Sequence, residues 1–562
     1  MNANQHPGAA RGPDRRRFLR GGVGALAGSA AYLLACGGDD DQEEAQTTTT
    51  SGTAAAGTTS GETPKRGGRL GRVWTNNSPN LNPLTNFPEG AILSAVNVYD
   101  RLISVRPGKD YVTEAAQSVE QPDPTTVIFK LKPGMTYQNR APVSGRAVSS
   151  EDIAKFQILV KDYPGAGNSF QRDSMQSVEA PDAQTVVFKL KAPNAYLFSL
   201  SQLAGGGTQA IIPQELHDNL DSNWPVGSGP YELAEYQLST RYLYKRFDGY
   251  REASRDLPYV DERLYQVLGD PTAQDAAFRS GQIDLWESGG PTPQTADLLK
   301  REMAGKIEMD EYPALTTISF SANATKPPFN DVRVREAIYR ILNRQQYIDL
   351  VEAGRGSIST GLLAVGLKDF LLDTKQTEKF WKQDPKAAKQ LLDAAGFPFD
   401  REFEVTTANA PPRNPQNLEV FQEQASQVGI KARLLPLPAT EWLTQRLQTG
   451  NWDIWISFAP GAETPQTPLR LQHTNTNSVH VYNGLKDPQT DAMIEKAEVT
   501  VDRNERIKLV NEIQLALLEK YTPYFLMYTP TAYLPRWKHV MDYELSIGDA
   551  GPLYQAQVWL DK

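Results

Sequence analysis

The chain has 562 residues, of which 40% are hydrophobic, and its formal net charge is −9. An acidic chain of this composition argues against nucleic acid as a partner and against broad contact with anionic lipid. Its length exceeds the roughly 250–300 residues that one hydrophobic core usually serves, so more than one lobe is expected.

Residues 1–35 predict an export signal. A basic segment precedes the apolar stretch 21–34, which is too short to span a bilayer. Paired arginines followed by Phe-Leu are similar to the twin-arginine address, which is read by a receptor and is not an anchor. The residues that carry this likeness are Arg15, Arg16, Arg17, Phe18 and Leu19. Removing the five arginines and one aspartate of this segment leaves a net charge of −13.

Cys36 is the only cysteine of the chain and ends the run Leu-Leu-Ala-Cys, which resembles a lipoprotein box. Its thiol would carry the lipid after cleavage; the alternative is an unmodified free cysteine. Residues 36–66 then combine the lipidated cysteine with a Gly-, Asp-, Glu- and Thr-rich tether that has too little apolar surface to fold. The expected location is extracytoplasmic, anchored by lipid to the cell membrane, in the periplasm or at the cell surface.

In the first half of the body, strands are predicted at 70–74, 125–132, 184–191, 242–245 and 263–268. Helices are predicted at 91–102, from the spacing of apolar residues, at 153–161 and at 274–280, with Gly281 as a C-cap. The helix at 153–161 begins after the capping run Ser149-Ser150-Glu151-Asp152. The strands at 125–132 and 184–191 echo each other, and each follows a Pro-Asp turn signal.

In the second half, strands are predicted at 316–321, 451–458 and 524–528, and helices at 332–343, 387–395 and 504–520. Gly396 follows the second of these helices as a stop signal. Helices and strands alternate throughout the predicted elements, and this alternation indicates an α/β protein.

Several blocks in order resemble the extracytoplasmic solute-binding proteins of ABC transporters, family 5, the peptide- and nickel-binding class. They are Asn80–Pro83 with Val98–Leu102, Phe129–Tyr137, Gly227–Tyr231, Ser280–Asp284, Pro327–Ala337 and Ala387–Gly396. The resemblance covers about residues 67–540. It implies a two-lobed periplasmic-binding-protein type II fold, a Venus flytrap, with an inserted small α/β domain.

The family's pattern implies the following domains. Lobe I is discontinuous and comprises 67–105, 220–312 and 524–562; the inserted domain is 106–219, and lobe II is 313–523. Hinge closure is expected about two crossing segments, near 311–319 and 521–528.

No HExxH, GxSxG or Walker A pattern appears in the sequence of the body, so a binding role without catalytic residues, cofactor or metal is expected. The partners would be a small polar solute (an oligopeptide, a sugar or an opine-like compound) and the transmembrane subunits of an ABC permease. The membrane is reached through the lipid anchor only, no nucleic acid is bound, and a monomer is expected. The candidate ligand-binding residues are Phe87, Glu89, Trp286, Glu287, Ser288, Asn323, Trp455, Phe458 and Glu463.

For Trp286 and Trp455 a place in the core is an open alternative, and for Glu89 a solvated position. Peptide binders of the family carry Asp-Tyr-x-Asp-Pro after the Trp-rich strand, with an aspartate that pairs the peptide amine. This chain has no aspartate there, and Glu463 is the nearest acid. Free-amine peptides are therefore in doubt, and a sugar or opine becomes credible. A ligand-presenting sensory or chaperone-like lipoprotein and an exported hydrolase are the alternative functions.

Overall fold

The computed structural model describes most of the chain after its first 62 residues. The described residues are 63–75, 80–84, 89–106, 109–163, 170–221, 224–314, 316–409, 413–459, 463–474, 486–543 and 551–562. The export signal, Cys36 and most of the tether lie outside them.

The first sheet has four strands in the order β1-β12-β11-β10. Their bounds are Arg69–Trp74 for β1, Glu262–Val267 for β12, Arg241–Arg246 for β11 and Tyr231–Gln237 for β10. β1 and β12 are parallel, whereas the other two pairs are antiparallel. Strands from segments about 160 to 195 positions apart therefore meet in one sheet.

A second, fully antiparallel sheet has the order β5-β6-β8-β7. It comprises β5 (Ala116–Asp123), β6 (Thr126–Leu131), β7 (Met175–Asp182) and β8 (Thr185–Leu190). The two echoing sequence segments are its central strands, so their similarity reflects two equivalent hairpins placed back to back. Helix α2 (Ser150–Asp162) lies between the hairpins in sequence, and Ser149 and Asp152 form its capping box as predicted.

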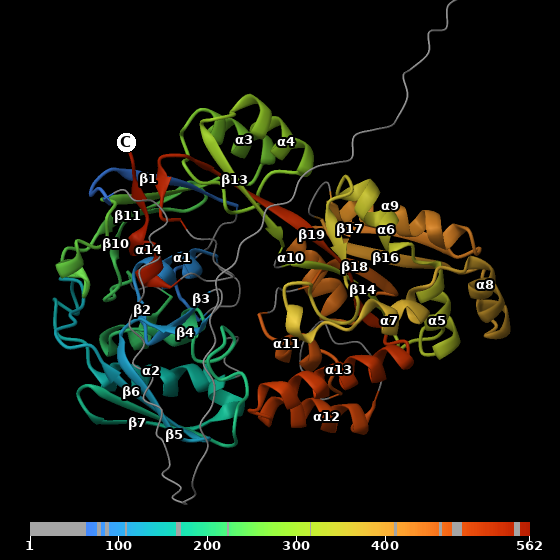
Figure 1. Ribbon diagram of the computed structural model, residues 1–562, viewed down its shortest axis with the longest axis horizontal. Coiled ribbons are helices and arrows are strands. Elements are labelled where there is room, and N and C mark those ends of the chain that lie inside the picture. The colour runs from blue at the N-terminus through green and yellow to red at the C-terminus, as the bar shows by residue number, and fades with distance from the viewer. Residues whose placement is uncertain are drawn as a thin grey trace, which may run out of the picture. The chain divides into compact units, whose positions relative to one another are not determined.

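The third sheet has the order β13-β19-β14-β18-β16-β17, with β15 also paired to β19. The bounds are Ile307–Pro313, Tyr524–Trp537, Thr317–Ala322, Ile454–Ala459, Glu402–Ala408, Lys431–Leu437 and, for β15, Gly356–Ile358. Figure 1 shows β13 and β19 running side by side from the neighbourhood of α3 and α4 into this sheet. β16 is parallel to both β17 and β18.

The remaining strands form three short pairs: β2 (Asp100–Arg101) with β9 (Ala210–Ile211), β3 (Ile103–Arg106) with β4 (Lys109–Thr113), and β20 (Val540–Met541) with β21 (Trp559–Leu560). Besides α2, the helices of the first half are α1 (Glu89–Asn97), α3 (Pro271–Arg279) and α4 (Pro293–Glu302). Those of the second half are α5 (Val332–Ile341), α6 (Arg344–Val351), α7 (Thr374–Trp381), α8 (Pro385–Ala394), α9 (Arg413–Ser426), α10 (Ala439–Glu441), α11 (Gln466–Arg470), α12 (Pro488–Val499) and α13 (Arg503–Glu519). The last helix, α14 (Pro552–Gln557), directly precedes β21.

The α/β class and the central parts of the predicted elements are confirmed, but three boundaries were wrong. The helix predicted over 91–102 ends at Asn97, the helix over 332–343 ends at Ile341, and the strand over 524–528 continues to Trp537. Asn343 belongs instead to the next helix, because its side chain caps α6 by accepting from the backbone N–H of Gln346.

Tertiary contacts end helix α1. Gly229 N donates to the carbonyl oxygen of Val98 (2.8 Å), directly after the helix. A Cβ on Gly227 would lie 2.0 Å from that same oxygen. Glycine is therefore required at Gly227 by close backbone approach, which explains the Gly-Ser-Gly-Pro-Tyr motif physically.

A buried ion triad joins distant parts of the first half. The guanidinium of Arg251 contacts carboxylate oxygens of Asp100 (2.6 Å) and Glu114 (2.7 Å), and all three side chains are at most 2% exposed. Glu114 also accepts from the backbone N–H of Leu553 (3.0 Å) in α14. Burial raises the pKa of Asp100 to about 7, with Arg251 acting against the shift. One arginine thus pairs with two buried acids, and Glu114 links this group to the C-terminal helix.

Among the described residues, no helix is both long and apolar enough to cross a membrane.

Replacing the buried cation tests the triad. Arg251→Met should lower the free energy of unfolding by about 3–5 kcal/mol, because it leaves two buried carboxylates without their cationic partner. The control is Arg301→Met, since Arg301 is 70% exposed and lies 3.8 Å from its nearest acid. The measurement is chemical denaturation, and equal losses in the two variants would contradict the role given to Arg251.

Candidate functional site

The segment 286–288 contains three predicted site residues with different surroundings. Glu287 forms an ion pair with the buried Arg72 and accepts from the hydroxyl of Tyr543 (3.3 Å). Ser288 shares a 2.9 Å hydrogen bond between hydroxyl groups with Thr75, the residue directly after β1. Glu287 and Ser288 therefore lie where β1 ends, and the Glu287 charge is already balanced by a protein cation.

Trp286 lies in a small hydrophobic core. Its side chain is 1% exposed and packs with Val73, Phe278 and Leu299. The indole Nε1 donates to Gln274 Oε1 (3.0 Å). This is the alternative that the sequence left open for this residue, with both the ring and its polar atom engaged inside the protein.

Asn323 and Trp455 are also buried. The amide of Asn323 donates to the carbonyl oxygens of Gly450 (3.2 Å) and Trp452 (3.1 Å), which ties the end of β14 to the turn before β18. Trp455 is 1% exposed, with its ring edge-on to Trp442 at a centroid distance of 6.0 Å. Both side chains support the third sheet from within.

The two residues predicted near the end of β18 differ in exposure and contacts. Phe458 is half-buried in β18 and packs against the core of the third sheet. Glu463 follows the strand and accepts a hydrogen bond from the backbone N–H of Leu200, a residue of the segment after β8. Burial raises the pKa of Glu463 to about 7, although the backbone N–H groups of Leu200 and Ser201 act in the opposite direction.

The remaining predicted residues lie outside the described part of the chain or have a side chain that is not described. Phe87, Cys36 and the signal residues Arg15 to Leu19 lie outside the described residues. Glu89 begins helix α1, and its side chain is not described.

A charged pair that the sequence did not suggest lies at the carboxyl end of β16. Arg413 starts α9, and its guanidinium contacts both oxygens of Glu352, at 2.5 and 3.1 Å. Glu352, 1% exposed, also accepts from the hydroxyl of Tyr528 (3.2 Å). Clefts of α/β proteins lie at the carboxyl ends of parallel strands, so the position of Arg413 after β16 was the available signal.

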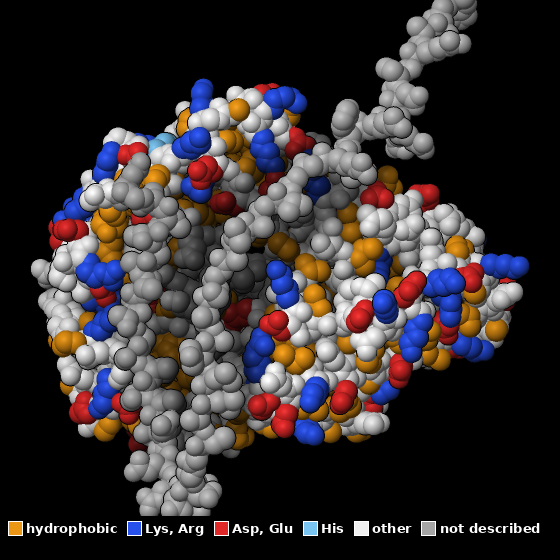
Figure 2. All heavy atoms as spheres, in the orientation of Figure 1, with side chains coloured by type: hydrophobic (Ala, Val, Ile, Leu, Met, Phe, Trp, Pro, Cys, Tyr) orange, Lys and Arg blue, Asp and Glu red, His pale blue; other side chains and the backbone are white. Residues whose placement is uncertain are grey.

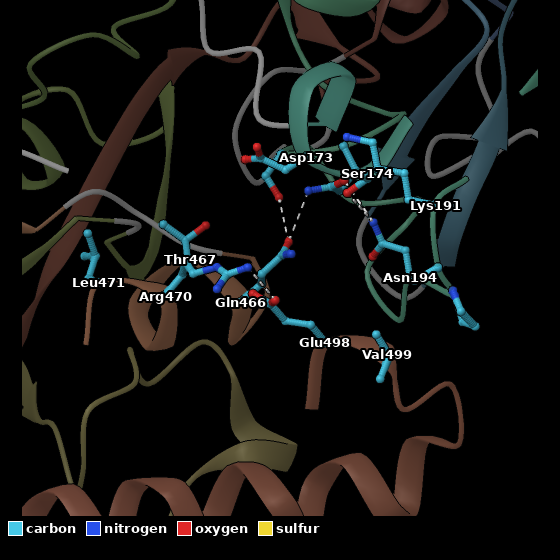
Figure 3. A pocket seen from close by; sticks show the side chains of 14 residues that line it. Asp173, Ser174, Lys191, Asn194, Gln466, Thr467, Arg470, Leu471, Glu498 and Val499 are labelled. Carbon is cyan, nitrogen blue, oxygen red and sulfur yellow. Dashed lines mark hydrogen bonds and ion pairs between the residues drawn. The ribbon is translucent and has the colours of Figure 1, made fainter. Parts of the chain in front are cut away.

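A pocket of about 400 Å³ lies between the segment after β8 and helices α11 and α12. Figure 3 shows Lys191 and Asn194 on one side, with Gln466, Arg470 and Glu498 facing them from the other. Arg470 and Glu498 form an ion pair (2.9 Å). The pocket contains none of the predicted site residues, so it is distinct from the strand ends described above.

Charge on the surface is mixed. On the described part of the face in Figure 2, Lys and Arg side chains alternate with Asp and Glu. This pattern is typical of a soluble body and gives no broad basic surface for a polyanion on that face.

The core position of Trp286 leads to a stability prediction. Trp286→Ala should lower the free energy of unfolding by about 3–5 kcal/mol through the cavity that it leaves. Trp286→Phe keeps most of the apolar volume and should cost clearly less. Thermal and denaturant unfolding measure both effects, and an unchanged stability of the alanine variant would contradict the core position.

Known proteins resemble the chain over most of its length. The family model of bacterial extracellular solute-binding proteins, family 5 (Middle) matches residues 110–479. The dipeptide-binding protein of Escherichia coli (strain K12) is 24% identical over 480 residues, covering 80% of this chain and 87% of that protein. The glutathione-binding protein GsiB of the same strain is 28% identical over 408 residues, covering 70% and 75%. The structure of AgaA from A.tumefacien R10, in complex with agropinic acid, has a TM-score of 0.74 at 21% identity and covers 88% of this chain and 99% of that one.

The family match extends over more than half of the chain. The structural likeness confirms the expected two-lobed type II α/β fold. Members of this family are solute-binding proteins, so the expectation of a binding protein that is not an enzyme is also confirmed. The chain belongs to the bacterial extracellular solute-binding proteins, family 5.

Proposed function

We propose that this chain captures a small polar solute between its two lobes and delivers it to the transmembrane subunits of an ABC permease. The observation that carries the proposal is strand β19, whose first part pairs with β14 and whose second part pairs with β13. A shared strand allows two lobes to rotate about a short crossing without separating. Solute binding that favours the closed arrangement then drives closure.

The proposed binding surface lies at strand ends on both sides of this crossing. On one side are Thr75, Glu287 and Ser288, near the end of β1. On the other are Arg413 after β16 and Phe458 in β18. Phe87 and Glu89 remain part of the proposal from the sequence. A cation, hydroxyl groups and an aromatic side chain together suit a solute that combines a carboxylate with apolar parts.

The solute class that we propose is a peptide or another carboxylate-bearing compound such as an opine. The names of the dipeptide- and glutathione-binding relatives support the peptide class. Glu463 favours a carboxylate-bearing compound such as an opine, because the carboxyl group of this residue is buried against the backbone of Leu200. A carboxyl group in that contact is not placed to pair the free amine of a peptide, so recognition would rest on the carboxylate end of the solute.

We also propose that Cys36 carries a lipid and that Arg15, Arg16, Arg17, Phe18 and Leu19 direct export by the twin-arginine route. Two or more acyl chains give stable anchorage to a membrane. The segment between Cys36 and β1 would then keep the binding body near its permease while leaving it free to close.

We propose in addition that the boundaries between the lobes and the inserted domain lie at 105/106, 219/220, 312/313 and 523/524.

Modifying the amine of a peptide tests the solute class. The full-length protein should bind a dipeptide and its N-acetyl derivative with dissociation constants within about threefold, because the Glu463 carboxyl group is buried against Leu200 and is not placed to meet the amine. Calorimetry gives the constants, and binding should stabilise the fold by roughly 2.7 kcal/mol at 100 times the dissociation constant. Binding that is lost on acetylation would contradict the inference from Glu463.

Removing the strand-end cation tests the position of the site. Arg413→Gln should weaken the binding of a carboxylate-bearing solute by roughly tenfold or more, since a charge-assisted hydrogen bond is lost. Arg433→Gln is the matched control, because Arg433 is 54% exposed on edge strand β17. Calorimetry with circular dichroism as a folding check measures the effect. Equal affinity in both variants would place the site elsewhere.

A further inference from the structure

A second group of contacts joins the inserted domain to the region after β18. We call residues 194–202, which follow β8, the clasp segment. The backbone N–H of Ala195 donates to the carbonyl oxygen of Glu498 (2.8 Å), and that of Leu200 donates to the Glu463 carboxylate. Gln202 donates to Gln466 Oε1 (3.3 Å). These contacts connect residues more than 260 positions apart, and none involves the strand ends proposed to bind solute.

An aromatic contact reinforces the clasp segment. The Tyr196 ring is 6% exposed and lies under the guanidinium of Arg506, 5.3 Å from its carbon to the ring centroid. Arg506 belongs to α13, so the clasp segment reaches three elements: the turn at Glu463, α12 through Glu498, and α13. Figure 3 shows the polar side chains at the edge of this junction, around the 400 Å³ pocket.

Two of the donors in this junction are main-chain groups. Their presence does not depend on the side chains at positions 195 and 200, whereas the acceptor at position 463 is a side chain. Glu463 is therefore the residue whose substitution changes the junction most directly. A buried carboxylate that accepts from backbone N–H groups is well paired, and its removal leaves those N–H groups without an acceptor.

We propose that the clasp segment and Glu463 form a latch that holds the inserted domain against lobe II in the closed arrangement, with or without bound solute. The inference rests on the proposed closure of the two lobes. It assigns Glu463 to closure in place of direct contact with solute.

The latch is expected to tighten in acid. The pKa of Glu463 is raised by burial to about 7 in the latched arrangement, and its ordinary value is 4.5. A raised pKa means that the latched form binds more protons than the open form. Latching is therefore favoured as the pH falls below about 7, and that advantage is lost as the pH rises through 7. The latching equilibrium should change on the order of 50-fold between pH 8 and pH 5.

The charged groups around Glu463 do not alter this sign. The ionisable side chains named at this junction and its pocket are Tyr196, Arg470, Glu498, Arg506, Asp173 and Lys191, and α12 and α13 carry further charged residues beyond them. Among described residues none adds a charge interaction that shifts the pKa of Glu463, where burial dominates. Burial also raises the pKa of Glu498, with Arg470 acting against it, which favours latching in acid as well.

Small-angle X-ray scattering of the full-length protein without solute tests the latch. The radius of gyration should fall from pH 8 to pH 5 in the wild type. Glu463→Gln keeps an acceptor without a charge, so its radius should change with pH clearly less than that of the wild type. Glu463→Ala lacks the acceptor and should be expanded at both pH values. Glu378→Gln, an exposed acid in α7, should behave like the wild type.

Hydrogen exchange at one pH gives a second readout that does not depend on the size of the movement. The amides of Ala195 and Leu200 should exchange at least tenfold faster in Glu463→Ala than in Glu378→Gln. The latch is overturned if the radius of the wild type does not change with pH and if Glu463→Ala changes neither the radius nor the exchange of these amides. If that protein still binds and compacts around a dipeptide, the proposed solute capture stands. Compaction in acid without any solute binding supports the latch and removes the proposed function.

Discussion

The structure depends on one continuous strand. β19 pairs with β14 from Tyr524 to Tyr528 and with β13 from Thr531 to Trp537, so its backbone belongs to two regions at once. The return path is the link between Pro313 and Thr317, which joins β13 to β14. Two connections therefore run between the regions: the middle of β19 and the link from β13 to β14. Any movement between the regions must be absorbed at these connections, because hydrogen bonding along the rest of β19 leaves little freedom. A solute-binding protein needs this combination of rigid lobes and a short crossing.

Asp284 shows how the crossing is secured to the first sheet. One of its carboxylate oxygens accepts from the backbone N–H of Gly71 in β1 (2.7 Å), and the other accepts from His539 (2.7 Å) and Lys562 (2.8 Å) after β19. The pKa of Asp284 lies below its ordinary value, since these donors outweigh the effect of burial. The Ser-Gly-Gln-Ile-Asp block that carried the family resemblance is therefore a structural junction between β1 and the C-terminal segment.

The elements that could be predicted from the sequence are those whose signals are local. The capping box at Ser149 and the helix stop at Gly396 depend on residues a few positions apart, and both elements formed as expected. The end of α1 could not be predicted, because Gly229, more than 130 positions away, approaches the carbonyl group of Val98. The full length of β19 could not be predicted either, since its second part is stabilised by pairing with β13, more than 210 positions earlier in the chain. Local periodicity contains no information on such partners.

By itself the sequence determined the family and the α/β class, because these depend on ordered motifs and composition. It also marked Glu463 as the acid nearest to the place where peptide binders of the family carry an aspartate. Only the tertiary structure decided which partner that acid meets. The carboxyl group is buried against Leu200, a contact made when two segments far apart in the chain come together. Sequence order cannot show this, since the chemistry of a carboxyl group is set by the donors and the burial that the fold places around it.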